Sequence, residues 1–233
     1  KNLNKSKKKP KRVIILGGNS FIGTYLKIKL KQQNVKYLSI TRNNIDLTSL
    51  NKTQKLKKIV KPQDTIILIA AKAPVKNFGM FEYNLKIIKN FCEIMKNEKF
   101  KHFIYLSSDA VYSDTKKKIT ENSATAPDNY HGLMHFSREQ ILKIFFKKKM
   151  CVIRPTLVFG ASDPHNGYGP NKFWRYLKID KNIKLFGKGE ERRDHIWVND
   201  VAEIMYNCIV YNTIGTINAV SGKITSFFEL AKK

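Results

Sequence analysis

The sequence has no long hydrophobic run and is poor in acidic residues. No apolar segment is long enough to cross a bilayer, and none has the pattern of a signal peptide, so we predict a cytoplasmic protein without a membrane partner. Only 18 Asp and Glu residues oppose 44 Lys and Arg residues, for a formal net charge of +26. Because the lysines are scattered over nearly every segment, we interpret them as a solvated surface that attracts anionic substrates. We expect no specific nucleic-acid partner.

Cysteine is also scarce, and the sequence has only Cys92, Cys151 and Cys208. These residues are odd in number, unclustered and each set in an apolar segment. The pattern predicts buried free thiols in a reducing compartment and argues against disulfides or a zinc site.

The clearest motif is a strand followed by a glycine turn and a helix. Residues 13–16 are four consecutive aliphatics, typical of a strand buried on both faces, and residues 24–33 carry apolar side chains at helical spacing. The turn has the spacing Gly17-x-x-Ser20-x-x-Gly23, with Ser20 where a further glycine is expected. Backbone amides and the positive helix end would both point at an anion, so we predict a diphosphate site. The alternative is an ordinary tight turn.

Further strands are predicted at 35–41, 65–71 and 102–108, and an amphipathic helix at 81–96. Buried strands that alternate with helices, without an internal repeat, predict an α/β fold with a Rossmann-like, doubly wound parallel sheet. The strand at 65–71 closes on the small residues Ala70 and Ala71, which leave room for a ligand across the sheet edge.

The second strand ends in Thr41 and Arg42, where dinucleotide sites select their cofactor. Sites for NAD usually place a carboxylate here, whereas an arginine accommodates the extra phosphate of NADP. Arg42 stands at this position and Asp46 follows four residues later. We therefore predict binding of NAD(P), with a slight preference for NADP. The alternative is that Arg42 is one more surface cation.

The segments 17–23, 68–71, 107–112, 154–160 and 185–202, together with Asn84, follow one another in a characteristic order. In that order they resemble the extended short-chain dehydrogenases/reductases, which are NAD(P)-dependent epimerases, dehydratases and reductases of nucleotide sugars. The resemblance runs from Val13 to the end of the chain.

The resemblance implies an NAD(P)-binding Rossmann domain over residues 12–153. A small substrate-binding lobe, interleaved with the final sheet elements, is implied over residues 154–233. The chain stops where family members continue, so we expect this lobe to be incomplete. Residues 1–11 are polar and basic, and we predict a flexible tail there. A homodimer is left open.

The glycine turn and the resemblance together imply the binding residues. Ser108 ends a strand at the cofactor edge, where its hydroxyl can hydrogen-bond a substrate oxygen. Asn171 and Arg193 match positions near the substrate diphosphate, which a guanidinium can clamp with two hydrogen bonds. The implied cofactor contacts are Gly17, Asn19, Ser20, Phe21, Ile22, Gly23, Thr41, Arg42, Asp46, Ala70, Ala71, Lys72, Asn84 and Pro155.

The catalytic pair departs from the family, which uses a Tyr and, four residues later on one helix face, a Lys that lowers the Tyr pKa. Alignment on Gly132 and Glu139 puts His131 in the Tyr position and His135 in the Lys position, while Tyr130 falls one position early. Three hypotheses remain open. His131 is a substitute acid/base, or Tyr130 swings in from a shifted helix start, or the site has lost its chemistry and kept binding.

Two other chemistries are disfavoured. His131 and His135 have metal-ligand spacing, but Gly132 stands where a zincin has its Glu and no third ligand follows, so no metal is predicted. Asp109 matches the acid of the Asp-Glu pair with which the family's dehydratases eliminate water, but Ala110 occupies the Glu position. We therefore predict an epimerase or ketoreductase of nucleotide-diphosphate sugars. The alternative is a catalytically degenerate NAD(P)-binding sensor or scaffold.

Overall fold

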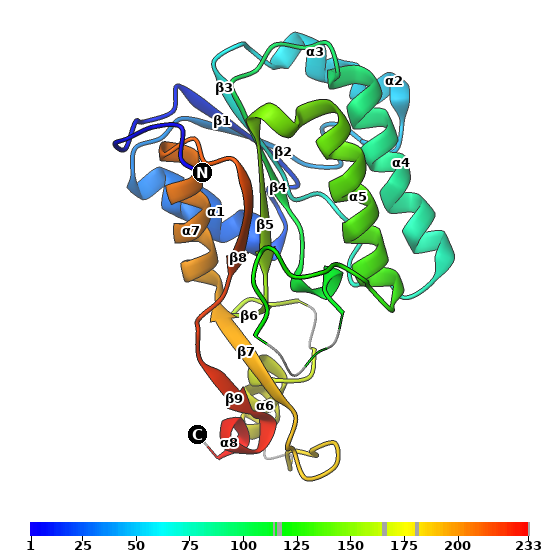
Figure 1. Ribbon diagram of the computed structural model, residues 1–233, viewed down its shortest axis with the longest axis vertical. Helices are drawn as coiled ribbons and strands as arrows, with labels where there is room; N and C mark the ends of the chain where they lie inside the picture. The colour runs from blue at the N-terminus through cyan, green and yellow to red at the C-terminus, as the bar shows by residue number, and fades with distance from the viewer. Residues whose placement is uncertain (114, 116–117, 165–166, 180–181, 233) are drawn as a thin grey trace.

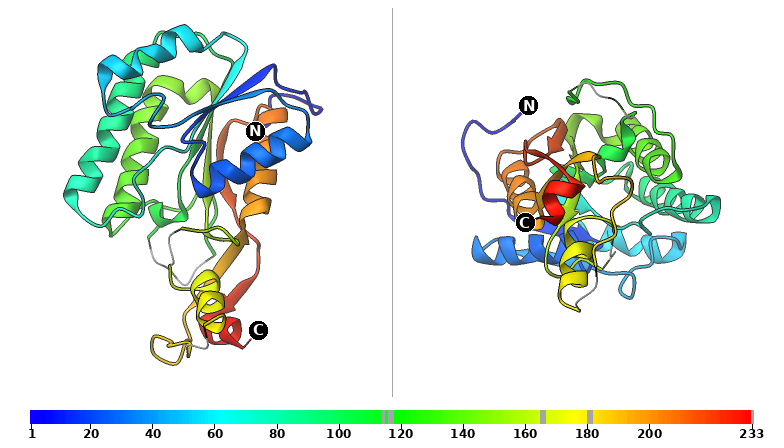
Figure 2. Two further views of the ribbon diagram at one scale, coloured as in Figure 1. Left: turned by 180° about the vertical axis from the view of Figure 1, so that it is seen from behind. Right: turned by 90° about the horizontal axis from the view of Figure 1, so that it is seen from below.

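The computed structural model describes residues 1–113, 115, 118–164, 167–179 and 182–232. A central sheet lies between two layers of helices, and a small lobe extends beyond the carboxyl ends of its strands (Figure 1). The view from behind shows the same separation between the layered body and the lobe (Figure 2, left).

Six parallel strands form the central sheet in the order β2-β1-β3-β4-β5-β8. The strands are β1 (Arg12–Leu16), β2 (Tyr37–Ile40), β3 (Asp64–Leu68), β4 (His102–Leu106), β5 (Met150–Pro155) and β8 (Gly215–Ala219). The three strands β3, β4 and β5 are buried along their whole length, because helices cover both faces of the sheet. The predicted doubly wound parallel α/β fold is confirmed.

Helices α1 (Phe21–Gln32) and α7 (Val198–Val210) pack against each other on one face of the sheet. The other face carries α4 (Phe78–Met95) and α5 (Tyr130–Phe146), with the short helices α2 (Leu50–Thr53) and α3 (Lys55–Ile59) beside α4. Two 3-10 turns, η1 (Asp109–Val111) and η2 (Lys147–Lys149), lie before and after α5. None of the helices in the described part of the chain combines the length and apolar character needed to cross a membrane.

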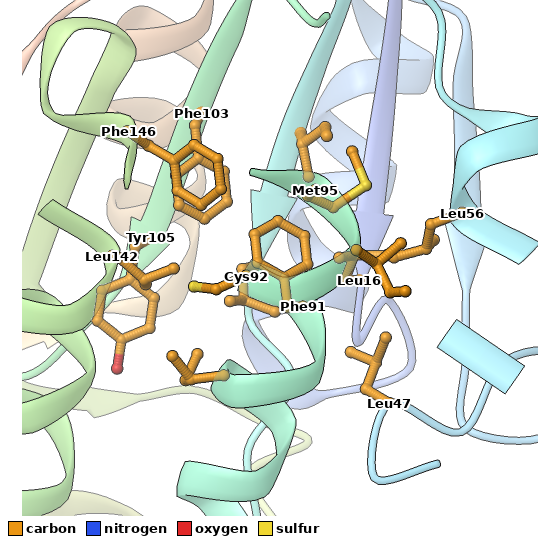
Figure 3. Packing of buried hydrophobic residues seen from close by; sticks show 14 of the residues in the cluster. Leu16, Leu47, Leu56, Phe91, Cys92, Met95, Phe103, Tyr105, Leu142 and Phe146 are labelled. Carbon is orange, nitrogen blue, oxygen red and sulfur yellow. The ribbon is translucent and has the colours of Figure 1, made fainter. Parts of the chain in front are cut away.

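Each face of the sheet has its own hydrophobic core. Along β1, Leu16 belongs to the core under α4 and α5, whereas its neighbour Ile15 belongs to the core under α1 and α7. Figure 3 shows the first core, in which the stacked rings of Phe91 and Phe103 have centroids 5.4 Å apart. All three cysteines are buried free thiols, as predicted.

The lobe consists of β6 (Leu157–Phe159), β7 (Arg192–Trp197), β9 (Ile224–Ser226), α6 (Pro170–Leu177) and α8 (Phe227–Ala231). Strand β7 pairs with β6 in parallel and with β9 antiparallel. Between β7 and β9 the chain returns to the main body as α7 and β8. The part of the chain after Arg154 therefore contributes to both the lobe and the central sheet.

The N-terminal residues are attached to the end of α7. Asn2 forms an isolated antiparallel bridge with Thr213. The backbone N–H groups of Asn4 and Lys8 donate to the carbonyl oxygens of Tyr211 and Val210 over 2.9 Å each. The flexible tail over residues 1–11 stays a prediction, although in this structure part of its backbone pairs with the end of α7, as backbone groups can whatever side chains they carry.

Candidate cofactor and substrate site

The turn after β1 is built around glycines that leave no room for side chains. Gly17 has a φ of +95°, and a Cβ at this position would lie 2.6 Å from the backbone nitrogen of Ala70. A Cβ on Gly23 would lie 2.8 Å from the carbonyl oxygen of Gly17. Ser20 caps α1, because its Oγ accepts a hydrogen bond of 3.1 Å from the Gly23 N–H. The capping role explains the serine at a position where the sequence pattern favours glycine.

This turn fits the diphosphate of a dinucleotide. The close glycine contacts keep the backbone bare, and the 12-residue helix α1 begins directly after the turn. Backbone N–H groups at such a helix start favour an anion. Ser20 and its neighbours Asn19, Phe21 and Ile22 line one end of a cavity of about 670 Å³.

The cavity runs from the turn past the carboxyl ends of the strands to the lobe. Its middle is lined by residues that follow β3, β4 and β5, and its far end by residues of α6 and β7. Of the residues singled out in the sequence, the wall includes Asn19, Ser20, Phe21, Ile22, Ala71, Ser108, Asp109, His131, His135, Pro155 and Asn171. The wall does not include Gly17, Gly23, Thr41, Arg42, Asp46, Ala70, Lys72, Asn84, Tyr130 or Arg193.

Ser108 and Asp109 stand together where β4 gives way to η1. The Ser108 hydroxyl donates to Asp109 Oδ1 over 3.2 Å and accepts from the Ala110 N–H over 3.2 Å. Burial raises the pKa of Asp109, while hydrogen bonds with Thr156 and Ser108 and the positive charge of Arg193 oppose the rise. The cavity therefore holds a carboxyl group that takes up a proton more readily than an exposed aspartate does.

His131 faces the cavity from the first turn of α5, which begins at Tyr130 and is capped by Asn129. Gly132 presses this helix start against η1, since a Cβ there would lie 2.0 Å from the carbonyl oxygen of Ala110. The Nδ1 of His131 accepts a long hydrogen bond of 3.5 Å from a backbone N–H in the loop after β3. Tyr130 is 43% exposed, so this structure presents the histidine and not the tyrosine to the cavity.

His135 lies one helical turn further on and is almost fully buried. Its Nδ1 and the Tyr105 hydroxyl are 2.8 Å apart, and its ring meets that of His131 edge-on with centroids 4.8 Å apart. The pKa of His135 is well below the ordinary value, mainly because of burial and secondly because of the charges of His131 and Arg138. His135 is therefore neutral and does not supply the positive charge expected of a lysine in this position.

Arg138 is a buried cation that the sequence reasoning missed. It is 1% exposed, its Nη2 donates to the Ala70 carbonyl oxygen over 2.8 Å, and its guanidinium carbon lies 5.2 Å from the centre of the Tyr105 ring. Its position three residues after His135, on the buried face of the same helix, was the only signal in the sequence.

Asn84 holds the backbone of the loop after β3. Its Oδ1 accepts from the Lys72 N–H over 2.9 Å, and its Nδ2 donates to the carbonyl oxygens of Lys72 and Met80. The structure therefore brings Asn84 and Lys72 together, next to Ala70, but it engages the Asn84 amide with backbone groups. The contact of Ala70, Lys72 and Asn84 with a cofactor stays a prediction.

Thr41, Arg42 and Asp46 lie on the turn after β2. The Thr41 hydroxyl donates to Asn44 Oδ1 over 2.8 Å, and Arg42 pairs with Asp46 at 3.8 Å while its side chain stays 70% exposed. Hydrogen bonds from Thr48 are the main reason that the pKa of Asp46 is lowered. The Arg42 guanidinium therefore remains accessible to an anion in solution.

The two residues predicted to hold the substrate diphosphate differ in their placement. Asn171 lines the cavity, but its Oδ1 accepts from the Gly160 N–H over 3.2 Å and its Nδ2 donates to Asp163 over 2.7 Å. Arg193 is half exposed and pairs with Glu191 at 2.7 Å. Asn171 thus fixes the loop between β6 and α6, and the structure does not place Arg193 on the cavity wall.

A buried ion pair lies beneath the site and was also missed. Glu139 of α5 accepts two hydrogen bonds from Arg154 of β5, over 2.9 Å and 2.6 Å, and a third from Ser107 over 2.6 Å. Arg154 also donates to the Tyr112 hydroxyl over 2.7 Å. The network joins the strand ends to the helix that carries His131. Across the described ranges, no group of three or more His, Cys, Asp or Glu side chains is placed to hold a metal ion.

Comparisons with known proteins agree with this geometry. The model of the NAD dependent epimerase/dehydratase family matches residues 13–216. The chain is 26% identical over 209 residues to N-acetyl-alpha-D-glucosaminyl-diphospho-ditrans,octacis-undecaprenol 4-epimerase of Escherichia coli O157:H7, covering 83% of this chain and 61% of that protein. It is 25% identical over 250 residues to a putative UDP-glucose 4-epimerase of Methanocaldococcus jannaschii, covering 94% of this chain and 79% of that protein.

Among solved structures, the fold is similar to that of the UDP-glucose 4-epimerase of Thermus thermophilus in complex with NAD. The TM-score is 0.83 at 19% identity, covering 95% of this chain and 81% of that one. The chain spans about three fifths of the length of the Escherichia coli relative.

Proposed function

The chain belongs to the NAD-dependent epimerase/dehydratase family, and we propose that it is an NAD(P)-dependent oxidoreductase of a nucleotide-diphosphate sugar, acting as an epimerase or ketoreductase. The observation that carries the proposal is the continuous cavity from the glycine turn to the lobe. Such a cavity can hold a dinucleotide at one end and a second anionic ligand at the other, with the strand ends between them.

The glycine turn and the Ser20-capped start of α1 would hold the cofactor diphosphate, and the exposed Arg42 favours the extra phosphate of NADP. A bound nicotinamide would supply reversible hydride transfer with the sugar carbon. The protein's own residues then have to orient the sugar and move a proton. Ser108 can hydrogen-bond the sugar oxygen from the end of β4, and His131 is the acid/base.

His131 can work as a base without a cationic neighbour, because an imidazole has an ordinary pKa of about 6.5 whereas a phenol has one of about 10. Its Nδ1 accepts the 3.5 Å bond from the Val75 N–H, which leaves the ring hydrogen on Nε2. To take up a proton at Nε2, the ring must carry its hydrogen on Nδ1. The hydrogen bond between Val75 and His131 Nδ1 is long and therefore weak, so it can break and let the ring carry its hydrogen on Nδ1.

The same bond favours a second candidate, which is binding without catalysis. In the tautomer that accepts from Val75, His131 offers the cavity a donor and not a base. His135 is neutral and adds no charge. A protein with this pair would bind NAD(P) and a nucleotide sugar as a sensor or scaffold.

Two measurements on the whole chain separate the candidates. NADPH binding is followed by its fluorescence, and turnover is measured on UDP-glucose, UDP-N-acetylglucosamine and UDP-glucuronic acid. If His131 is the acid/base, His131→Ala lowers kcat by about 100-fold, while the adjacent control Tyr130→Phe leaves it unchanged. Binding of both ligands without turnover supports the second candidate. Failure to bind both NADPH and NADH overturns both candidates.

A further inference from the structure

The lobe contributes a histidine to the cavity wall, and one nitrogen of its ring has no hydrogen-bond partner among the described residues. His195 of β7 lines the cavity, and its Nε2 atom is shielded from solvent by the surrounding protein. A buried polar atom without a hydrogen bond is rare in native proteins and calls for an explanation. A bound ligand is one such explanation, and it applies here because His195 lines the cavity.

The surroundings of His195 hold the ring in place but offer its Nε2 atom no hydrogen bond. The ring meets that of Phe227 edge-on with centroids 5.6 Å apart, and Phe227 in turn packs against Tyr168 at 4.5 Å. Gly169 has a φ of +132°, and a Cβ on it would lie 3.6 Å from His195 Nε2. A glycine here therefore places no side chain against the nitrogen.

The chemistry of the ring fixes what Nε2 can bind. Burial lowers the pKa of His195, although Asp194 and a hydrogen bond to the backbone of Arg193 oppose the effect. Because Nε2 has no partner, that backbone bond uses the Nδ1 hydrogen. In a neutral imidazole with hydrogen on Nδ1, Nε2 is an acceptor. Its missing partner is therefore a hydroxyl or an N–H group.

We propose that His195 Nε2 accepts a hydrogen bond from a hydroxyl or imide N–H group of the nucleotide-sugar substrate and so determines which substrates the lobe admits. The inference rests on the proposed function, because it assigns a residue to the substrate end of the same cavity. The donor is a sugar or ribose hydroxyl, or the N3–H of a uracil or thymine base. Cytosine has an acceptor at that position and would be disfavoured.

The test is a binding titration at pH 8, where the ring is neutral, with UDP-glucose, CDP-glucose, UDP and NADPH as ligands. His195→Phe keeps an aromatic ring against Phe227 and removes the acceptor. We expect it to weaken UDP-glucose binding on the order of tenfold and to leave NADPH binding unchanged. His195→Asn, which restores an acceptor, recovers part of the loss. Trp197→Phe is the matched control, because this half-exposed residue of the same strand does not line the cavity.

The ligand series locates the donor. A loss with UDP-glucose and UDP but not with CDP-glucose assigns the uracil N3–H, and an equal loss with all three assigns a ribose hydroxyl. A loss with both sugar nucleotides but not with UDP assigns the sugar. If the wild-type protein binds UDP-glucose and His195→Phe binds it equally well, the inference about His195 is overturned and the proposed function stands. If the folded wild-type protein binds NADPH but none of the nucleotides, the proposed substrate class is overturned, and the role of His195 with it.

Discussion

Lowering the pH from 7 to 4 is expected to destabilise the protein through one buried side chain, His102. This residue is 1% exposed in β4, and its Nε2 lies 2.7 Å from the carbonyl oxygen of Thr213. Since a carbonyl only accepts, Nε2 carries the hydrogen of the neutral ring. Nδ1 has no partner in the described part of the chain, so a second proton would have no acceptor there.

Burial is the main reason that the pKa of His102 falls from 6.5 to about 4. The unfolded chain takes up a proton near pH 6.5 and the folded protein only near pH 4, so the stability that His102 provides is complete above pH 6.5 and is lost as the pH falls to 4. Each pKa unit corresponds to about 1.36 kcal/mol, so the loss is about 3 kcal/mol of unfolding free energy.

Urea unfolding followed by circular dichroism at pH 7 and pH 4 measures this loss. His102→Leu keeps a side chain of similar size without a titrating group. Between pH 7 and pH 4, the unfolding free energy of this variant is expected to fall by about 3 kcal/mol less than that of the wild-type protein. Other titrating groups cancel in the comparison. An equal fall in both proteins, or an NMR titration of the His102 ring near pH 6.5, would refute the reasoning.

Three further changes test the site. Gly23→Val is expected to abolish NADPH binding, because even a Cβ at this position would lie 2.8 Å from a backbone oxygen. The control Gly79→Val, where a Cβ would have no neighbour closer than 3.7 Å, retains binding. Equal binding by both variants contradicts a diphosphate site at the glycine turn. Glu139→Gln removes the charge that pairs with the buried Arg154 guanidinium and is expected to lower the unfolding free energy by about 3–5 kcal/mol. The control Glu93→Gln, at an exposed position, is expected to lower it by less than about 0.5 kcal/mol. Similar urea midpoints for the two variants would contradict a stabilising role of the ion pair. Arg42→Ala is expected to weaken NADP binding about tenfold without affecting NAD, and unchanged NADP affinity in a titration argues against the preference.

The strands and the glycine turn could be predicted because their signals are local. Four consecutive aliphatics before Gly17 require burial on both faces, and the turn spacing requires a close approach of backbone to a ligand. Ser108 was expected beside the cofactor because it ends a strand, whereas His131 was assigned only through the resemblance to the family; both line the cavity. The inferences about the strands, the turn and Ser108 needed only neighbouring residues.

The rest depends on partners that are distant in the sequence. Arg138 is buried because the Ala70 carbonyl lies opposite it, 68 residues away, and no local pattern encodes that meeting. Asn2 and Thr213 pair through the backbone, which any sequence can offer. The environment of the His195 nitrogen is made by Gly169 and by the Phe227 ring of α8, so it exists only once the lobe is assembled.

The segment 156–196 leaves the sheet after β5 and returns at the start of α7, and its two ends lie side by side. Leu157 is paired with His195 and Phe159 with Trp197. An inserted segment whose two ends lie side by side can be lengthened, shortened or exchanged without moving the elements that it joins, here β5 and α7. The wall of the cavity opposite the glycine turn can therefore diverge in evolution, or be grafted from one relative to another, while the sheet preserves the turn unchanged.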